Sequence, residues 1–189
     1  TIRRCRRSIS APDKVRPLFL GESLHALSLL RARVIGCSPK GRCRIVRDFK
    51  GKTAFITGGA EGIGLALGRT FVEAGMNVML ADIEADALSA AVQSFADTGA
   101  TVRGVICDVA DPASVARAAQ TSFDTFGNVH VLCNNAGVAG GSGIDNISLD
   151  NWRWVLDVNL MGVLHGIHAF LPHIRAHGEG GHIVNAASM

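Results

Sequence analysis

The amino-acid sequence predicts an α/β protein built on a doubly wound parallel sheet. From residue 52 onward, short apolar runs alternate with helical segments of about a dozen residues, which is the pattern of successive βαβ units. The short runs are apolar on both faces, as expected of strands that helices cover on each side. Because βαβ crossovers are right-handed, few topologies remain, and the doubly wound sheet is the simplest of them.

The first two strands and their helices follow from local signals. Residues 53–57 form an apolar strand, and the helix expected over 62–74 is followed by Gly75, a residue that commonly ends a helix. Residues 76–81 form the second strand, apolar except for one asparagine. The alanine-rich segment 85–96 is strongly helix-forming.

The third strand, residues 101–107, leads into a helix with clear start and stop signals. Asp111 is the expected N-cap, and Pro112 suits the first helical position because it has no N–H to leave unpaired. We expect this helix to end at Phe126, before Gly127.

The last elements are a strand, a loop, a long helix and a strand. Residues 129–133 form the fourth strand, and a glycine-rich loop covers 137–143. Ser148 is the expected N-cap of a helix that continues to about Phe170, near Pro172. Residues 182–186 form the final strand.

The segment TGGAEGIG, residues 57–64, connects the first strand to the first helix. Gly58 permits a tight turn, Gly62 lets backbone amides approach a pyrophosphate, and Gly64 lets helix and strand pack closely. The start of the helix adds free N–H groups and a partial positive charge. This setting predicts a dinucleotide site in a Rossmann-type fold.

Two acids favour NAD over NADP as the dinucleotide. Asp82 ends the second strand 18 residues after Gly64, near the spacing of about 20 at which an acid contacts the adenosine ribose. A carboxylate there would also repel a 2′-phosphate, and Glu61 would add to that repulsion. No Arg or Lys follows Asp82 closely. The alternative for either acid is an ordinary solvated loop charge.

Charge divides the chain near residue 47. Residues 1–47 contain 12 Lys and Arg against 2 acids, whereas residues 48–189 contain 7 against 14. We therefore expect a basic, disordered extension over 1–47, or translated sequence from upstream of the true start, followed by one NAD-binding domain over 48–189. The alternatives for the extension are an organelle-targeting presequence and a nucleic-acid arm. Against a nucleic-acid arm, the segment lacks the interleaved aromatic residues that would stack on bases, so no nucleic-acid partner is expected.

Cysteine spacing argues against a metal site or a disulfide framework, and hydropathy argues against a membrane helix. The five cysteines form no C-x-x-C pair and are odd in number, so neither a metal site nor a disulfide framework is expected; Cys107 and Cys133 are expected to be small buried residues. No apolar run reaches the roughly 18 residues of a membrane helix, since Glu22 and His25 interrupt the best candidate, 18–30. We expect a protein of the cytoplasm that does not enter a membrane.

Short motifs in the family's order resemble the short-chain dehydrogenase/reductase family over roughly residues 49–189. They are TGGAEGIG, CDV at 107–109, NNAG at 134–137 and, further on, DVNLMG with GHIVNAAS. The resemblance implies that Asp108 contacts the adenine and that NNAG stabilises the sheet and borders the cofactor. The implied cofactor-binding residues are Gly58, Glu61, Gly62, Ile63, Gly64, Asp82, Ile83, Asp108, Val109, Asn135, Ala136 and Gly137.

The same resemblance implies two catalytic residues. Ser188 would hydrogen-bond the substrate oxygen during hydride transfer, and Asn159 would help to hold a water for proton relay. In the family, a Tyr-x-x-x-Lys pair follows the serine, and its tyrosine is the general acid/base. The sequence contains no tyrosine, and Met189 follows Ser188.

The expected function follows from these residues. We expect an incomplete chain, without the later strands and inactive alone, of an NAD-dependent oxidoreductase that acts on a small alcohol or carbonyl compound. The alternative is a catalytically dead short form that binds NAD or has a regulatory role. The family resemblance also implies a homodimer or homotetramer for the full-length form.

Overall fold

The computed structural model describes residues 46–140 and 148–187. The strands are β1 (Thr53–Thr57), β2 (Asn77–Asp82), β3 (Val102–Ile106), β4 (Val131–Asn134) and β5 (His182–Asn185). The helices are α1 (Gly62–Glu73), α2 (Ala85–Gln93), α3 (Pro112–Phe126), α4 (Leu149–Leu156) and α5 (Gly162–Ala176), with a 3-10 turn η2 (Ala96–Thr98) and a π-helical turn η4 (Asp157–Met161). The predicted strands and helices are all present, in the predicted order.

The five strands form one parallel sheet in the order β3-β2-β1-β4-β5. Phe55 in the central strand lies opposite Met79 of β2 and Leu132 of β4. The chain therefore builds outward from β1 to one side and then from β4 to the other. This confirms the doubly wound topology and places its switch point between β1 and β4.

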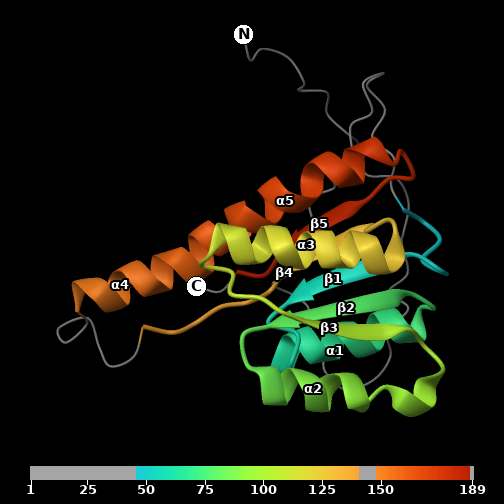
Figure 1. Cartoon of the computed structure of the whole chain (residues 1–189), viewed down its shortest axis with the longest axis horizontal. Coiled ribbons are helices and arrows are strands. Elements are labelled where there is room, and N and C mark those ends of the chain that lie inside the picture. The colour runs from blue at the N-terminus through green and yellow to red at the C-terminus, as the bar shows by residue number, and fades with distance from the viewer. Residues whose placement is uncertain (1–45, 141–147, 188–189) are drawn as a thin grey trace, which may run out of the picture.

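Helices cover both faces of the sheet, with α3 and α5 on one face and α1 and α2 on the other (Figure 1). Successive side chains of β1 point toward opposite helical layers. Phe55 is fully buried toward α5, where its ring centroid lies 4.5 Å from that of Phe170. Ile56 faces the opposite layer, which also contains Leu80 and Phe95. Each buried side chain of this size stabilises the fold by about 1.5–3 kcal/mol.

The third strand differs from the expectation of apolar strands covered on both faces. In β3, Arg103, Gly104 and Ile106 are exposed. The expectation was wrong here because β3 is an edge strand in the described sheet and only part of it lies beneath a helix.

Both predicted N-caps are confirmed. The Asp111 carboxylate accepts hydrogen bonds from the amides of Ala113 (2.9 Å) and Ser114 (3.1 Å), and the Ser148 hydroxyl accepts one from the Asn151 amide (3.1 Å). Each cap satisfies donors that the first turn of a helix leaves free.

The helix that begins after Ser148 is longer than predicted. The segments α4, η4 and α5 form one helix over Leu149–Ala176, with Pro172 inside it. An internal proline costs a helix about 3 kcal/mol, but Phe170 and Ile174, on either side of it, are buried in the core and offset that cost. By length and composition alone this helix is apolar enough to cross a membrane, and 22% of its most apolar window is buried. The expectation that 18–30 is the best candidate for a membrane helix was therefore wrong, because mean hydropathy tolerates the few charged residues that interrupt the apolar positions of 149–176.

Candidate cofactor site

The glycine turn after β1 is a tight, left-handed stretch of backbone. Gly58 and Gly62 have φ values of 62° and 51°, a region that side chains other than glycine rarely adopt. A Cβ on Gly64 would lie 1.9 Å from the Gly58 carbonyl oxygen, so the helix start and the turn touch. A Cβ on Gly62 would meet nothing within 4 Å, so space is open in front of the turn. The turn therefore has the shape of a cradle.

The start of α1 presents backbone donors to that open space. Glu61 is the N-cap but makes no side-chain cap hydrogen bond. The Leu65 amide donates to the Glu61 carbonyl (3.2 Å), and the helical amides before it are those that a helix start leaves free. Such amides, with the helix dipole, bind anions such as a pyrophosphate.

Asp82, at the end of β2, is bonded to the glycine turn. Its Oδ2 accepts a hydrogen bond from the Ala60 amide (3.0 Å) and its Oδ1 one from the Glu84 amide (3.2 Å). Each carboxylate oxygen has a second lone pair, so both remain able to accept from ribose hydroxyls. Ile63 and Ile83 are 54% and 57% exposed, and these apolar side chains suit contact with a bound nucleotide.

The turn after β3 is fixed against α5. The Asp108 amide donates to the Ser114 hydroxyl (3.1 Å), and the Asp108 carboxylate accepts from the Ala110 amide (2.9 Å). Val109 is buried, and a Cβ on Gly162 would lie 2.9 Å from its side chain. This packing holds Asp108 beyond the carboxyl end of β3.

The NNAG segment is hydrogen-bonded to the glycine turn across the switch point. The Thr57 hydroxyl accepts from the amides of Asn135 (2.9 Å) and Ala136 (3.0 Å). The Asn135 side-chain amide donates to the carbonyls of Thr57 (3.0 Å) and Gly58 (3.2 Å). Sequence analysis missed Thr57, although its place as the first residue of the glycine motif was a signal.

The first asparagine of NNAG is internal to the sheet. Asn134 is buried, and its side-chain amide donates to the Asn185 Oδ1 on β5 (2.8 Å). Its own Oδ1 is buried and has no hydrogen-bond partner within the described residues, and a Cβ on Gly166 would lie 2.3 Å from it. Asn134 thus joins β4 to β5 at a point where Gly166 of α5 lies directly against the sheet.

Asn159 lies in the π-helical turn, a feature often found at functional sites. Its Oδ1 accepts from the Val138 amide (2.8 Å), and its Nδ2 donates to the Val138 carbonyl (2.9 Å). Sequence analysis predicted a residue that helps to hold a water; the structure shows its side chain bonded to backbone. The other predicted catalytic residue, Ser188, lies outside the described residues.

The described cysteines are unsuited to nucleophilic chemistry. Cys107 and Cys133 are both buried, as predicted. Burial raises the pKa of the Cys107 thiol to about 11 and that of Cys133 to about 12, so both are neutral thiols at neutral pH.

A second polar cluster lies away from the candidate cofactor site, at the amino ends of β1 and β4. Atoms of His130, His177 and Glu179 that are able to bind a metal lie within 4.8 Å of one another. However, the Nδ1 atoms of both histidines accept backbone amides, from Thr53 (3.2 Å) and Glu179 (3.1 Å).

In their neutral forms both histidines therefore carry the proton on Nε2, where His130 meets Glu179 (3.1 Å) and His177 meets the Val129 carbonyl (3.2 Å). Metal-bound histidines instead donate from their second nitrogen. This arrangement favours a hydrogen-bonded cluster, and the absence of a metal stays a prediction.

Burial lowers the pKa of His130 and of His177, which favours these neutral forms. Glu179 also pairs with Lys52 and accepts from the Asn128 side chain (2.8 Å). The hydrogen bond from Lys52, with those from His130 and Asn128, lowers the pKa of Glu179 to about 2.

The predicted cofactor residues thus lie together at the carboxyl-terminal end of the sheet, just beyond the ends of strands β1 to β4. Comparison with known proteins agrees with this geometry. The family model described as short chain dehydrogenase matches residues 52–189. A 1-deoxy-11-beta-hydroxypentalenate dehydrogenase from Streptomyces avermitilis is 42% identical over 139 residues, which cover 72% of this chain and 52% of that protein.

Two further relatives differ in cofactor. A short-chain dehydrogenase/reductase from Burkholderia phymatum, solved in complex with NAD, is 41% identical with a TM-score of 0.72, over 74% of this chain and 50% of that one. An NADP-dependent (R)-specific alcohol dehydrogenase from Lentilactobacillus kefiri is 36% identical, over 74% of this chain and 55% of that protein. The chain spans about half the length of the relatives it matches. With its family-model match, strand order and glycine turn, the chain belongs to the short-chain dehydrogenase family.

Proposed function

We propose that the protein is an NAD-dependent oxidoreductase that acts on a small alcohol or carbonyl compound. The observation that carries this proposal is the hydrogen-bonded junction of the glycine turn with Asp82 on one side and with Asn135 on the other. The junction lies at the switch point, where doubly wound sheets bind dinucleotides. The bound nicotinamide would supply hydride transfer to or from the substrate.

The residues of the junction fit a dinucleotide in a definite direction. The Asp82 carboxylate would hold the adenosine ribose, while Ile83 and Asp108 would border the adenine. The free amides at the start of α1, next to the open space at Gly62, would bind the pyrophosphate. The nicotinamide half would then extend past β1 toward Ala136 and Gly137.

Charge supports NAD rather than NADP. The Asp82 carboxylate is fixed by two backbone amides beside the glycine turn, and the exposed Glu61 lies in that turn. Both would repel a 2′-phosphate. Relatives of both cofactor types are known, so this preference is a property to be measured on this chain.

The chemical step needs groups beyond the cradle. Ser188 and Asn159 are the proposed catalytic residues, on the family resemblance. The sequence has no tyrosine to act as general acid/base. We therefore propose that the 189-residue chain binds NAD without turning over alcohol on its own, and that turnover is an activity of the whole protein.

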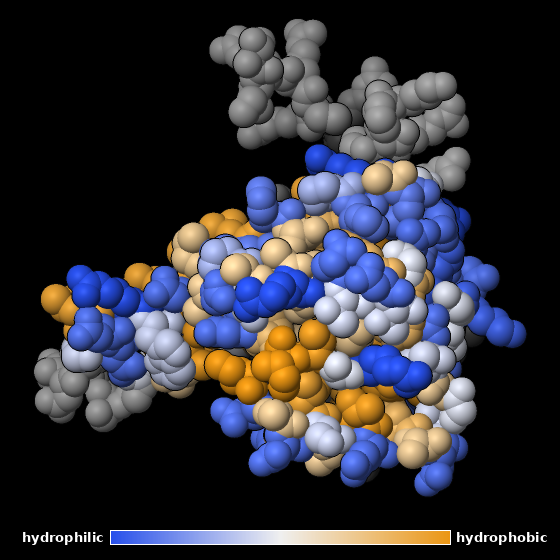
Figure 2. Space-filling view, in the orientation of Figure 1, coloured by the Kyte–Doolittle hydropathy of each residue, from blue (hydrophilic) through white to orange (hydrophobic). Residues whose placement is uncertain are grey.

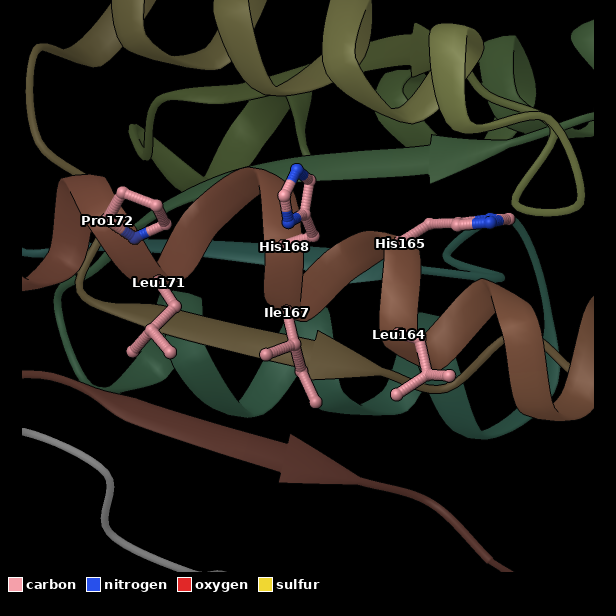
Figure 3. Close-up of a pocket in the computed structure, with 6 residues that line it drawn as sticks. All are labelled: Leu164, His165, Ile167, His168, Leu171 and Pro172. Atoms are coloured by element: carbon pink, nitrogen blue, oxygen red, sulfur yellow. The ribbon is translucent and has the colours of Figure 1, made fainter. Parts of the chain in front are cut away.

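A partly exposed apolar face of the long helix is proposed as a subunit interface of the whole protein. Leu164, Ile167 and Leu171 lie along one side of α5 and, with His165, His168 and Pro172, line a pocket of about 500 Å³ (Figure 3). Leu164 is exposed, whereas Ile167 and Leu171 are half-buried and also contact the core. Trp152, Trp154 and Leu160 are exposed elsewhere on this helix, and hydrophobic surface broken by polar residues is visible along it (Figure 2). Exposed apolar area of this kind marks an interaction site, and a homodimer or homotetramer would cover it.

Titration of the purified chain with NAD and NADP tests the cofactor proposal. We expect NAD to bind more tightly, and Asp82→Ala to weaken NAD binding about tenfold because the ribose acceptors are lost. Asp97→Ala is the matched control, since Asp97 is an exposed acid in η2. Absence of NAD binding by the parent chain, or equal loss in both variants, would contradict the proposal.

A further inference from the structure

Two asparagines of the long helix hold the backbone that follows NNAG. Asn159 bonds both the amide and the carbonyl of Val138, at 2.8 and 2.9 Å. Eight residues earlier on the helix, the Asn151 side-chain amide donates to the Gly140 carbonyl at 2.5 Å. Together they hold residues 138–140 against η4 and the first turn of α4.

The position of Asn151 is itself well determined. Its backbone amide donates to the Ser148 hydroxyl, so its place in the first turn of α4 is fixed by the helix cap. Its side chain is half-buried toward the 138–140 segment. The neighbouring Asp150 and Arg153 instead pair with each other at 2.9 Å and are 90% and 73% exposed. Only Asn151 of these three connects the helix turn to the segment.

The held segment forms the continuation of the candidate site. On the strand order β2-β1-β4, the ribose acceptor Asp82 ends β2, and the pyrophosphate donors follow β1. A dinucleotide that runs in this direction reaches the end of β4 last, where Ala136 is bonded to Thr57. Residues 138–140 continue from that point, so they border the nicotinamide half and not the adenosine half.

We propose that Asn151 is a positioning residue for the nicotinamide half of the cofactor, acting through the carbonyl of Gly140. This inference rests on the proposed function. Its side chain fixes the wall against which the nicotinamide end is placed, while the adenosine end is held by other elements. Loss of the Asn151 donor would loosen one half of the site and leave the other half intact.

The test compares NAD with ADP-ribose, which lacks the nicotinamide ring, on the 189-residue chain. The variants are Asn151→Ala and Asn151→Asp; the second keeps the shape of the side chain but has no N–H to donate. Asp150→Ala is the control. We expect both Asn151 variants to bind NAD about three- to tenfold more weakly, the effect of one lost hydrogen bond, and to bind ADP-ribose within about twofold of the parent.

The outcomes separate this inference from the proposed function. If the parent binds neither ligand, the proposed function fails and the inference fails with it. If the parent binds NAD but the Asn151 variants bind it normally, or lose NAD and ADP-ribose affinity equally, the positioning role alone is wrong. A preference for NAD over ADP-ribose that falls in both variants, and persists in the Asp150→Ala control, supports it.

Discussion

Gly64 and Gly58 lie so close together that a methyl group on Gly64 would stand 1.9 Å from the Gly58 carbonyl oxygen. That oxygen belongs to the backbone of a turn that also accepts a hydrogen bond from Asn135, so it has little room to move. The first turn of α1 therefore packs directly against the turn that follows β1, and this close approach requires glycine at position 64.

Gly64→Ala should lower the free energy of unfolding by about 1–3 kcal/mol, toward the upper end because the atom that the methyl group meets belongs to the backbone. NAD binding should be lost with it. Gly62→Ala is the matched control, because a methyl group there meets open space and adds only the strain of φ 51°, about 1 kcal/mol. Urea denaturation of both variants measures the difference; equal destabilisation would show that the close contact does not limit the site.

Asp82→Asn should shift cofactor preference toward NADP. Asparagine keeps an oxygen able to accept from the Ala60 amide but removes the charge that opposes a 2′-phosphate. We expect NADP affinity to rise about tenfold while NAD affinity falls less than that. Parallel titrations with the two cofactors measure the ratio, and a ratio unchanged from the parent would assign the preference to another group.

Stability should fall as the pH drops below about 6.5. The pKa values of His130 and His177 are lowered in the folded state, so the unfolded chain takes up protons first. Their contribution is complete above the unfolded pKa and is lost as the pH falls toward the folded values, by at most about 1.4 kcal/mol per pH unit for each proton.

Thermal or urea unfolding between pH 7.5 and 5 measures how steeply the free energy of unfolding falls as the pH drops. His177→Gln should reduce this slope, and His168→Gln, which replaces an exposed histidine outside this cluster, is the matched control. Glu179 contributes to stability over a lower pH range: its pKa is lowered to about 2 in the folded state, so its contribution is present above pH 4.5 and is lost as the pH falls toward 2. A slope in the parent chain that equals that of His177→Gln would contradict the role of this histidine.

Gly166 and Asn134 should be energetically coupled. A methyl group on Gly166 would lie 2.3 Å from the Asn134 Oδ1, so Gly166→Ala should cost about 1–3 kcal/mol. Asn134→Ala loses the bond to Asn185 but removes the oxygen that the methyl group would strike. A double-mutant cycle in urea should show that the combined cost is smaller than the sum of the single costs by at least about 1 kcal/mol. Strict additivity would mean that α5 shifts away from the sheet.

Local signals in the sequence were sufficient to predict most of the helices and strands. Asp111 and Pro112 start α3, and Gly127 ends it, because capping depends on residues within a single turn. The strand runs and the glycine turn are equally local. The length of the final helix was not predictable in this way, since it continues past Pro172 only because Phe170 and Ile174 are buried in the core.

The candidate site was predictable as a set of motifs but not as a set of contacts. Asp82 was predicted from its place at the end of a strand, and Asn135 from the resemblance of NNAG to a family motif. That Asp82 bonds the Ala60 amide and Asn135 the Gly58 carbonyl depends on strands far apart in sequence lying side by side. The contact of His130 with Glu179 likewise joins residues that are 49 positions apart. Asn151 and Gly140 are only 11 residues apart, but neither lies in a strand and no local motif predicts their hydrogen bond.

The central position of β1 has a consequence for how the chain is made. Among the described strands it is the first to be synthesised, and β2 and β3 can join it soon afterwards, with α1 and α2 against one face. Its other flank pairs Ala54 with Val131, a residue that leaves the ribosome 77 positions later. Pairings between such distant residues form late in folding. The pairing of β1 with β4 is therefore expected to form after that of β1 with β2, so a nascent chain is able to complete the part of the site proposed to hold the adenosine before the part proposed to hold the nicotinamide exists.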